Sequence, residues 1–233
     1  LKNTELTSFD LRYEYYPKGI ELISVGIFKK DFKNPIEESL LGVSGLAPYK
    51  SWQNSDYAHI TGLELEYRKN LDFIPSRFGF LFLNTNLSVS SSEVAIPEKV
   101  YVFVQRSTSS EIVPFANPVT ERTRPLQGQS NLVYNTSLNY NNQSGYELNL
   151  AYNSFSKRLV SISGDIPGHF WELPFHSLNI TGSKKIGPFK ASFKIQNVLG
   201  ESVIHAHDFR GDYYNTKEFN PGRNLSISLQ YNN

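Results

Sequence analysis

Two histidines in the sequence "HAHD" (205–208) are the residues best placed for metal chemistry. His205 and His207 are separated by one residue, so both side chains project from the same face of an extended strand and could share one ion. No third ligand follows from the spacing, and the sequence has no cysteine to supply a thiolate. We therefore predict the polar base of a loop and no metal site. Both histidines are kept as candidate contacts for an extracellular ligand or partner.

The acidic and nucleophilic residues are not spaced for catalysis. Glu37 and Glu38 are adjacent, and neighbouring side chains of an extended chain point to opposite sides, so they do not form a catalytic pair. The sequence contains no nucleophile elbow, no phosphate-binding loop and no Cys/His pair. It therefore predicts a protein that is not an enzyme and that needs no cofactor.

Tryptophan and arginine in the long segments between strands are the remaining binding candidates. Trp52 and Trp171 could stack on a ligand, although such residues also serve as packing anchors of loops. Arg106, Arg122 and Arg124 could meet an anionic ligand, or they could be solvated loop charges. The sequence leaves these alternatives open.

These candidates are positioned by β-strands, because apolar and polar residues alternate along nearly the whole chain. In "RNLSISLQYNN" (223–233), Leu225, Ile227 and Leu229 fall on one face of a strand and the polar residues between them fall on the other. We predict nine strands, which lie near residues 7–16, 20–32, 57–69, 77–91, 126–140, from 146 onward, 175–183, 189–199 and 223–233. The predicted fold class is all-β and antiparallel.

The connections between these strands alternate in length. Short turns rich in Gly, Pro and Asn occupy residues 17–19, 70–76, 141–145 and 185–188. Long connections occupy residues 33–56, 92–125, 165–174 and 200–222, so short and long connections fall at opposite ends of the sheet. A transmembrane barrel has this asymmetry, with short periplasmic turns and longer extracellular loops. Within the longest connection, "VYVFVQ" (100–105) predicts a hairpin above the membrane.

Tyrosines support the barrel interpretation, because they occur at strand ends beside the short turns, where a membrane–water boundary would lie. These tyrosines are Tyr13, Tyr15, Tyr140, Tyr146 and Tyr231. The polar strand faces are then expected to line a hydrated lumen, through Arg12, Glu14, Glu64, Glu66, Arg68, Asn84, Asn135, Asn139, Lys190 and Lys194. A soluble β-sandwich would also satisfy these charges and remains an alternative.

Composition narrows the class of protein further. The chain has 233 residues, a net charge of +1 and 19% charged residues. This composition lacks the excess of positive charge that is typical of nucleic-acid-binding proteins. No stretch approaches the roughly 18 apolar residues of a spanning helix. The absence of both Cys and Met fits a mature secreted or outer-membrane protein, or a fragment of one.

Five segments resemble the C-terminal barrel of TonB-dependent outer-membrane receptors, in order and in spacing, across nearly the whole chain. They are "LRYEYYPKGIELISVGIFKKDFKNPIE" (11–37), "ITGLELEYRKNLDFIP" (60–75), "RPLQGQSNLVYNTSLNYNN" (124–142), "NVLGES" (197–202) and "NPGRNLSISLQY" (220–231). The resemblance implies a barrel of 22 strands around an N-terminal plug. It also implies import of metal chelates, glycans or peptides, powered through TonB.

The expected role of residues 1–233 is therefore the last nine strands of one such barrel in the outer membrane of a Gram-negative cell. The expected partners are membrane lipid, lipopolysaccharide, the remaining strands and plug, and TonB through that plug. An odd strand number and the terminal Asn233, where such barrels end in an aromatic residue, depart from a complete barrel. A second functional hypothesis is a receptor-like barrel that holds a surface lipoprotein or another outer-membrane protein without transport. The sequence does not identify the ligand.

Overall fold

The computed structural model describes residues 1–43, 46–71, 73–74, 79–96, 98–105, 110–116, 122–142, 144–163 and 168–231. All regular secondary structure in these ranges is β-strand. In the same ranges, no helix is long and apolar enough to cross a membrane.

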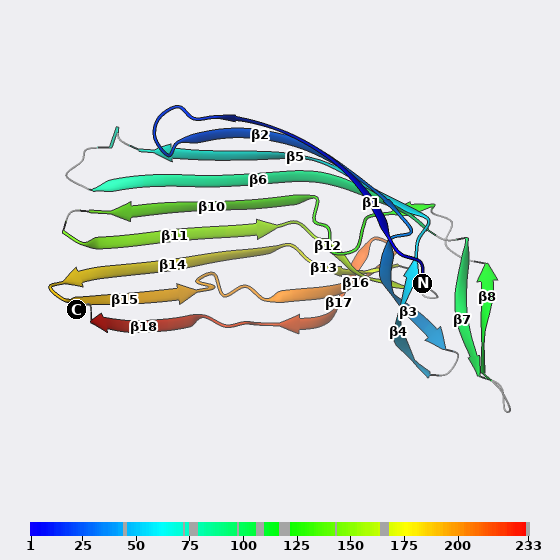
Figure 1. Cartoon of the computed structure of the whole chain (residues 1–233). Coiled ribbons are helices and arrows are strands. Elements are labelled where there is room, and N and C mark those ends of the chain that lie inside the picture. The colour runs from blue at the N-terminus through cyan, green and yellow to red at the C-terminus, as the bar shows by residue number, and fades with distance from the viewer. Residues whose placement is uncertain are drawn as a thin grey trace.

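The largest unit is a sheet of nine long antiparallel strands, which we call the long sheet (Figure 1). Each strand pairs with the next one in chain order, so the sheet is a meander without crossovers. Its strands are β1 (Glu5–Tyr15), β2 (Leu22–Lys33), β5 (Tyr57–Asn70), β6 (Phe80–Ala95), β10 (Leu132–Asn141), β11 (Tyr146–Phe155), β14 (Phe175–Ile186), β15 (Phe189–Gln196) and β18 (Asn224–Tyr231). The short β9 (Thr123–Arg124) pairs with the end of β6. The nine predicted strands are confirmed.

The two ends of the long sheet differ, as the connection lengths predict. The connections β1–β2, β5–β6, β10–β11 and β14–β15 lie at one end, which we call the turn end (Figure 1). The opposite end, which we call the cap end, carries the N-terminus and most of the other strands. The predicted hairpin at residues 100–105 is confirmed as β7 (Lys99–Gln105) and β8 (Ser110–Ala116), which lie at the cap end (Figure 1).

Six strands at the cap end form a second sheet, the cap sheet, in the order β17–β16–β13–β12–β3–β4. They are β3 (Ile36–Val43), β4 (Leu46–Asn54), β12 (Arg158–Ser163), β13 (Phe170–Glu172), β16 (Val203–Phe209) and β17 (Asp212–Phe219). The long connections predicted at 33–56, 165–174 and 200–222 are present, but they are not irregular loops, because parts of these segments form strands that pair with distant segments. One of these pairings is parallel and sets Ile162 of β12 opposite Ser39 of β3.

One strand boundary also differs from prediction. The fifth long strand begins at Leu132 and not near residue 126. The residues before it cross the cap end of β6, where Leu126 N donates to Ser92 Oγ at 3.0 Å and Gln129 Nε2 donates to Ser90 Oγ at 2.6 Å. Side-chain hydrogen bonds thus hold this segment outside the strand ladder.

The convex face of the long sheet is apolar from strand to strand. One row across the register holds Leu83, Leu138, Leu150, Ile180, Ile195 and Leu225. On β18, Ile227 is 79% exposed. Fully buried apolar side chains occur instead at the cap end, at Ala58, Val94, Leu159 and Ala206. The apolar surface of the long sheet therefore has no protein core beneath it in the described part of the chain.

At two glycines, one on each face of the long sheet, an aromatic ring from the neighbouring strand packs over the glycine backbone. A β-carbon at Gly62 would collide with the ring of Phe28, and a β-carbon at Gly182 would collide with the ring of Phe193. Each ring lies directly across the strand pair from its glycine. Glycine is required at both positions because a backbone without a side chain leaves room for the ring.

Candidate functional site

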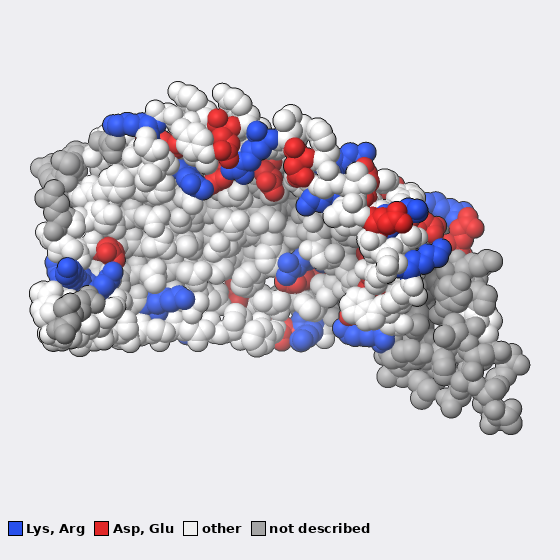
Figure 2. Space-filling model, viewed as in Figure 1, with Lys and Arg blue, Asp and Glu red and all other residues white. Residues whose placement is uncertain are grey.

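The concave face of the long sheet collects the polar side chains that alternate with the apolar ones (Figure 2). Charged residues gather over β1, β2 and β5, and the hollowed face beside them is largely uncharged (Figure 2). The charged wall comprises Asp10, Arg12, Glu14, Lys30, Glu64, Glu66 and Arg68. The neutral wall comprises Asn84, Asn86, Ser88, Asn135, Ser137, Asn139, Asn149, Asn153, Ser177, Asn179 and Thr181 on β6, β10, β11 and β14.

The strand register places all ten polar residues that were predicted to line a lumen on this concave face. Arg12 and Glu64 share one row with Ser88, and Glu66 shares the next row with Asn135. Lys194 lies in the row of Asn149 and Asn139, which come from strands β11 and β10. Their common face follows from an unbroken register across the long sheet, because side chains two residues apart point to the same side.

Four residues of the charged wall form one ion-pair network. Arg12 donates to Glu14 Oε1 and to Glu66 Oε2, both at 2.7 Å, and Arg68 Nη2 approaches Glu66 Oε1 at 2.5 Å. The two arginines are exposed. Tyr16, beyond the end of β1, donates to Glu14 Oε2 at 2.5 Å, and this hydrogen bond raises the pKa of the phenol. The network lies at the surface, with three exposed residues around Glu66, whose side chain is 14% exposed, and each pair in it contributes little to stability.

Glu64 has a different environment from the other acids of the charged wall. It lies opposite Gly26 on β2 and Ser88 on β6, and Arg12, on the far side of Gly26, forms its ion pairs with Glu14 and Glu66 instead. Within the described residues it forms no ion pair. Glu64 is therefore an exposed carboxylate that remains available to a partner.

The neutral wall relies on amide and hydroxyl groups. Asn149 Nδ2 donates to Asn139 Oδ1 at 2.7 Å, and Asn139 Nδ2 approaches Ser137 Oγ at 3.4 Å. Asn135 and Asn153 make no side-chain hydrogen bond with another described residue. The sequence analysis recognised only part of this wall. The signal for the rest of the wall is a neutral polar residue at every second position, as in Asn135, Ser137, Asn139 and Asn141 of "YNTSLNYNN" (134–142).

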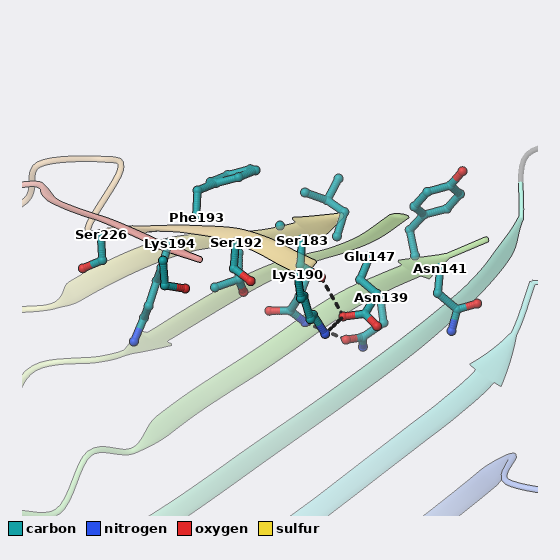
Figure 3. Close-up of a pocket in the computed structure, with 15 residues that line it drawn as sticks. Asn139, Asn141, Glu147, Ser183, Lys190, Ser192, Phe193, Lys194 and Ser226 are labelled. Carbon is teal, nitrogen blue, oxygen red and sulfur yellow. Dashed lines mark hydrogen bonds and ion pairs between the residues drawn. The ribbon is translucent and has the colours of Figure 1, made fainter. Parts of the chain in front are cut away.

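At the turn end the concave face deepens into a hollow of about 600 Å³ between β10 and β18 (Figure 3). Lys190 Nζ lies 2.7 Å from Glu147 Oε2, which also accepts a hydrogen bond from Ser183 Oγ at 2.8 Å. Figure 3 shows these three side chains pointing toward one another, whereas Phe193 points to the opposite side of the sheet. Lys194 also lines the hollow and makes no ion pair with a described residue.

Arg124, which the sequence analysis kept as a candidate contact for an anionic ligand, is buried at the cap end. Its side chain is 3% exposed and forms a two-pronged pair with Glu37, whose side chain is 4% exposed, at 2.6 and 3.0 Å. Gln127 N also donates to Glu37 Oε1 at 3.3 Å. The guanidinium of Arg124 is thus closed to an external ligand. Glu37, rejected above as part of a catalytic pair, anchors β3 to β9 instead.

The two candidate histidines face different neighbours. His205 Nε2 lies 4.0 Å from Glu172 Oε2, and Arg158 holds the same carboxylate at 2.9 Å. The ring of His207 lies 4.9 Å from that of Phe170, measured between centroids. No group of three potential metal ligands occurs among the described residues.

The other predicted contact residues are dispersed over the cap end. Trp52 on β4 is 58% exposed, and Arg122 is exposed with its Nη1 3.8 Å from Glu98 Oε1. Trp171 on β13 packs against Lys157, whose Nζ lies 4.9 Å from the centre of the indole ring. Arg106 lies outside the described residues. The structure therefore brings together the polar residues of the long sheet but not the contact residues expected in the loops.

An antiparallel meander with an apolar convex face, a polar concave face, short turns at one end and long extensions at the other is the wall of a transmembrane β-barrel. The chain belongs to the family of TonB-dependent receptor-like β-barrels, because residues 1–198 match the model of that family. Among curated proteins, none matches the sequence significantly.

Solved structures with the same fold are siderophore receptors. A mutant ferric enterobactin receptor from Pseudomonas aeruginosa, in complex with enterobactin, is 18% identical with a TM-score of 0.57, over 98% of this chain and 31% of that chain. The siderophore receptor PirA from Acinetobacter baumannii is 16% identical with a TM-score of 0.55, over 99% of this chain and 32% of that chain. The chain thus spans about a third of the length of these receptors.

Proposed function

We propose that this chain forms part of the wall of an outer-membrane receptor that imports a bulky, hydrophilic nutrient through a plugged barrel. The observation that carries the proposal is the two-faced long sheet, with an apolar convex face and a polar, hollowed concave face. A sheet of this kind is stable with lipid on one side and water on the other. The concave face is then the lumen wall, and the ten polar residues on it contact water, the plug or the passing nutrient.

The ends of the long sheet suggest its orientation in the membrane. On the convex face near the cap end, Asp31 contacts Lys29 at 3.2 Å and His59 at 2.5 Å, and this charged group ends the apolar band. Charged side chains at this height fit the head groups of lipopolysaccharide on the cell surface. The cap end then faces the outside of the cell and the turn end faces the periplasm.

The edges of the long sheet call for further strands. Within the described part of the chain, β1 and β18 each have one partner strand in the long sheet and do not pair with each other. An unpaired edge in hydrocarbon costs several kcal/mol for each unsatisfied backbone group. We infer that additional strands close the barrel to the 22 of the family, that a plug fills it, and that TonB acts through this plug.

The nutrient belongs to the classes that such receptors import, which are metal chelates, glycans and peptides. Enterobactin is the ligand of one solved neighbour, and the low identity to that receptor transfers the fold and not the ligand. Trp52, Arg122, Trp171, His205 and His207 are the candidate contacts at the extracellular end.

A second function is supported by one observation at the cap end. Trp52 on β4 and Tyr214 on β17 are large aromatic side chains that remain exposed on the two edge strands of the cap sheet. Exposed aromatic residues are common in protein–protein contacts. The alternative is therefore a receptor-like barrel that holds a surface lipoprotein or another outer-membrane protein.

The deciding experiment uses the complete gene in its own host. A deletion strain is compared with the wild type for energy-dependent uptake of labelled ferric siderophores, oligosaccharides and oligopeptides, with and without functional TonB. Loss of uptake of one class in both mutant strains supports import. Unchanged uptake of all three classes, together with a surface protein that co-purifies with the receptor, supports the alternative.

Orientation is tested separately with single cysteines in the complete receptor. Asp212→Cys lies at the first residue of β17, beside the β16–β17 turn at the cap end, and Ser144→Cys lies in the β10–β11 turn. On intact cells an impermeant maleimide should label Asp212→Cys and leave Ser144→Cys unlabelled until the outer membrane is permeabilised. The reverse labelling pattern would contradict the proposed orientation.

A further inference from the structure

The concave face is divided into two walls that differ in charge although they belong to one sheet. The charged wall holds both acids and bases, and four of them are locked in the Arg12–Glu14–Glu66–Arg68 network. Over β6, β10, β11 and β14 the neutral wall presents Asn, Ser and Thr side chains, interrupted by the apolar Phe82, Val133 and Ala151. The charged residues on this face of the four strands, Glu147 and Lys185, lie at the turn end. The boundary falls between β5 and β6, where Glu66 pairs with Asn86 and Arg68 pairs with Asn84. Strand geometry does not require this division, because the same positions alternate in both halves.

The two walls interact differently with a molecule that lies against them. Hydrogen bonds in which one group is charged are roughly twice as strong as those between neutral groups. The charged wall therefore suits a partner that stays in place, and Glu64 offers it an acid that no described residue pairs. An amide both donates and accepts, so the neutral wall can exchange one hydrogen-bonding partner for another without exposing an unpaired charge.

The neutral wall is also continuous from one end of the long sheet to the other. Near the cap end it begins beside Phe155 and Phe175, whose ring centroids are 5.8 Å apart. At the turn end Asn139, Asn149 and Thr181 also line the hollow of about 600 Å³. A solute that follows this wall reaches the hollow without crossing an ion pair of the charged wall.

We propose that the neutral wall is the path along which a hydrophilic solute crosses the lumen. The charged wall then holds the plug, which stays in place inside the barrel. The inference rests on the proposed function, because it assigns a route to import. Movement along a pore requires sites that bind the solute weakly and in succession, and the neutral amide and hydroxyl groups spaced along β6, β10, β11 and β14 provide such sites. Along the neutral wall the solute is bound by hydrogen bonds, and it meets charged side chains in the hollow, at Lys194 and the Lys190–Glu147 pair.

The inference is tested by thiol accessibility in the complete receptor, after any cysteine outside these residues has been replaced by serine. The chain itself contains no cysteine, so single cysteines report without background from it. Asn135→Cys and Asn153→Cys probe the neutral wall, and Asp10→Cys and Glu64→Cys probe the charged wall. Two positions on each wall guard against one variant that fails to assemble, and heat-modifiable migration verifies assembly of each.

Intact, energised cells are treated with fluorescein maleimide, and the labelling rates of the four cysteines are measured. The neutral-wall cysteines should react at least about tenfold faster than the charged-wall cysteines, a ratio that corresponds to roughly 1.4 kcal/mol of protection. Equal rates, or faster labelling of the charged wall, would overturn the inference. Labelling needs no transport substrate, so the proposal of import and the proposal of a path along the neutral wall can be refuted independently of each other. A rate difference without energy-dependent uptake refutes import alone, and uptake with equal rates refutes the path alone.

Discussion

The long sheet is antiparallel throughout and the cap sheet contains one parallel pair, but the larger difference between them lies in what stabilises each sheet. The long sheet exposes its apolar residues, including Ile227 and Leu229, and buries few of them. The cap sheet encloses Leu159 and Ala206 and is tied to β9 by the buried Arg124–Glu37 pair. One sheet thus depends on the solvent that surrounds it, and the other depends on contacts within the protein. The long sheet should therefore be destabilised by substitutions that change its surface toward lipid, and the cap sheet by substitutions that break contacts within the protein.

The largest effect is expected from breaking the buried pair of the cap. Arg124→Met leaves the Glu37 carboxylate buried without its cation, which costs about 3–5 kcal/mol. The cap should open locally while the long sheet stays assembled. Hydrogen exchange of β3 and β12 should accelerate, and heat-modifiable migration of the receptor should remain normal.

The matched control for this prediction is the double variant Arg124→Met/Glu37→Met. Replacement of both charges by apolar groups of similar volume removes the uncompensated charge, so protection of β3 and β12 should largely return. If the double variant exchanges as fast as the single one, the pair does not hold the cap.

A somewhat smaller effect is expected from a charge on the convex face. Leu150 lies between Leu138 and Ile180 in the middle of the apolar band, and Leu150→Arg should cost roughly 2–4 kcal/mol in lipid. Unfolding of the complete receptor in urea, followed by migration on gels, measures the loss. Asn153→Arg on the concave face of the same strand should be tolerated. An equal loss of stability in both variants would indicate a sheet with two buried faces and would favour the soluble β-sandwich.

The smallest effect is expected from the exposed ion pair of the long sheet. Arg68→Gln removes the contact with Glu66 at the surface, and such pairs contribute about 0–1 kcal/mol. The midpoint of unfolding should move little, and any shift should shrink as salt is raised from low to physiological concentration. A loss as large as that of Arg124→Met would contradict the contrast between a hydrated and a buried pair.

The long sheet could be predicted from the sequence because its information is local. Strict alternation in segments such as 223–233 sets the strand, its two faces and its register, and turn residues set its ends. The cap sheet could not be predicted, because its strands are short and its pairings join distant segments. A bulge between Leu159 and Ser161 also interrupts the alternation there.

The candidate site divides in the same way. The polar residues of the concave face follow from alternation alone, so the sequence predicts that all ten share one face of the sheet, and the register places them together; their contact with a lumen stays a prediction. The burial of Arg124 was not predictable, because its partner Glu37 lies in another segment of the chain and no local pattern connects them. The uniform chemistry of the neutral wall emerges only when β6, β10, β11 and β14 are set side by side.

The parallel pairing of β12 with β3 has a consequence for the order of assembly. Ser39 and Ile162 meet only after the chain between them has been laid down as β5, β6, β10 and β11. Closing so long a loop early would carry a large entropic cost, whereas each neighbouring hairpin of the long sheet closes a short one. The hairpins should therefore form first and the cap sheet last. A chain stalled during membrane insertion would then display an ordered wall beneath a cap that has not yet formed.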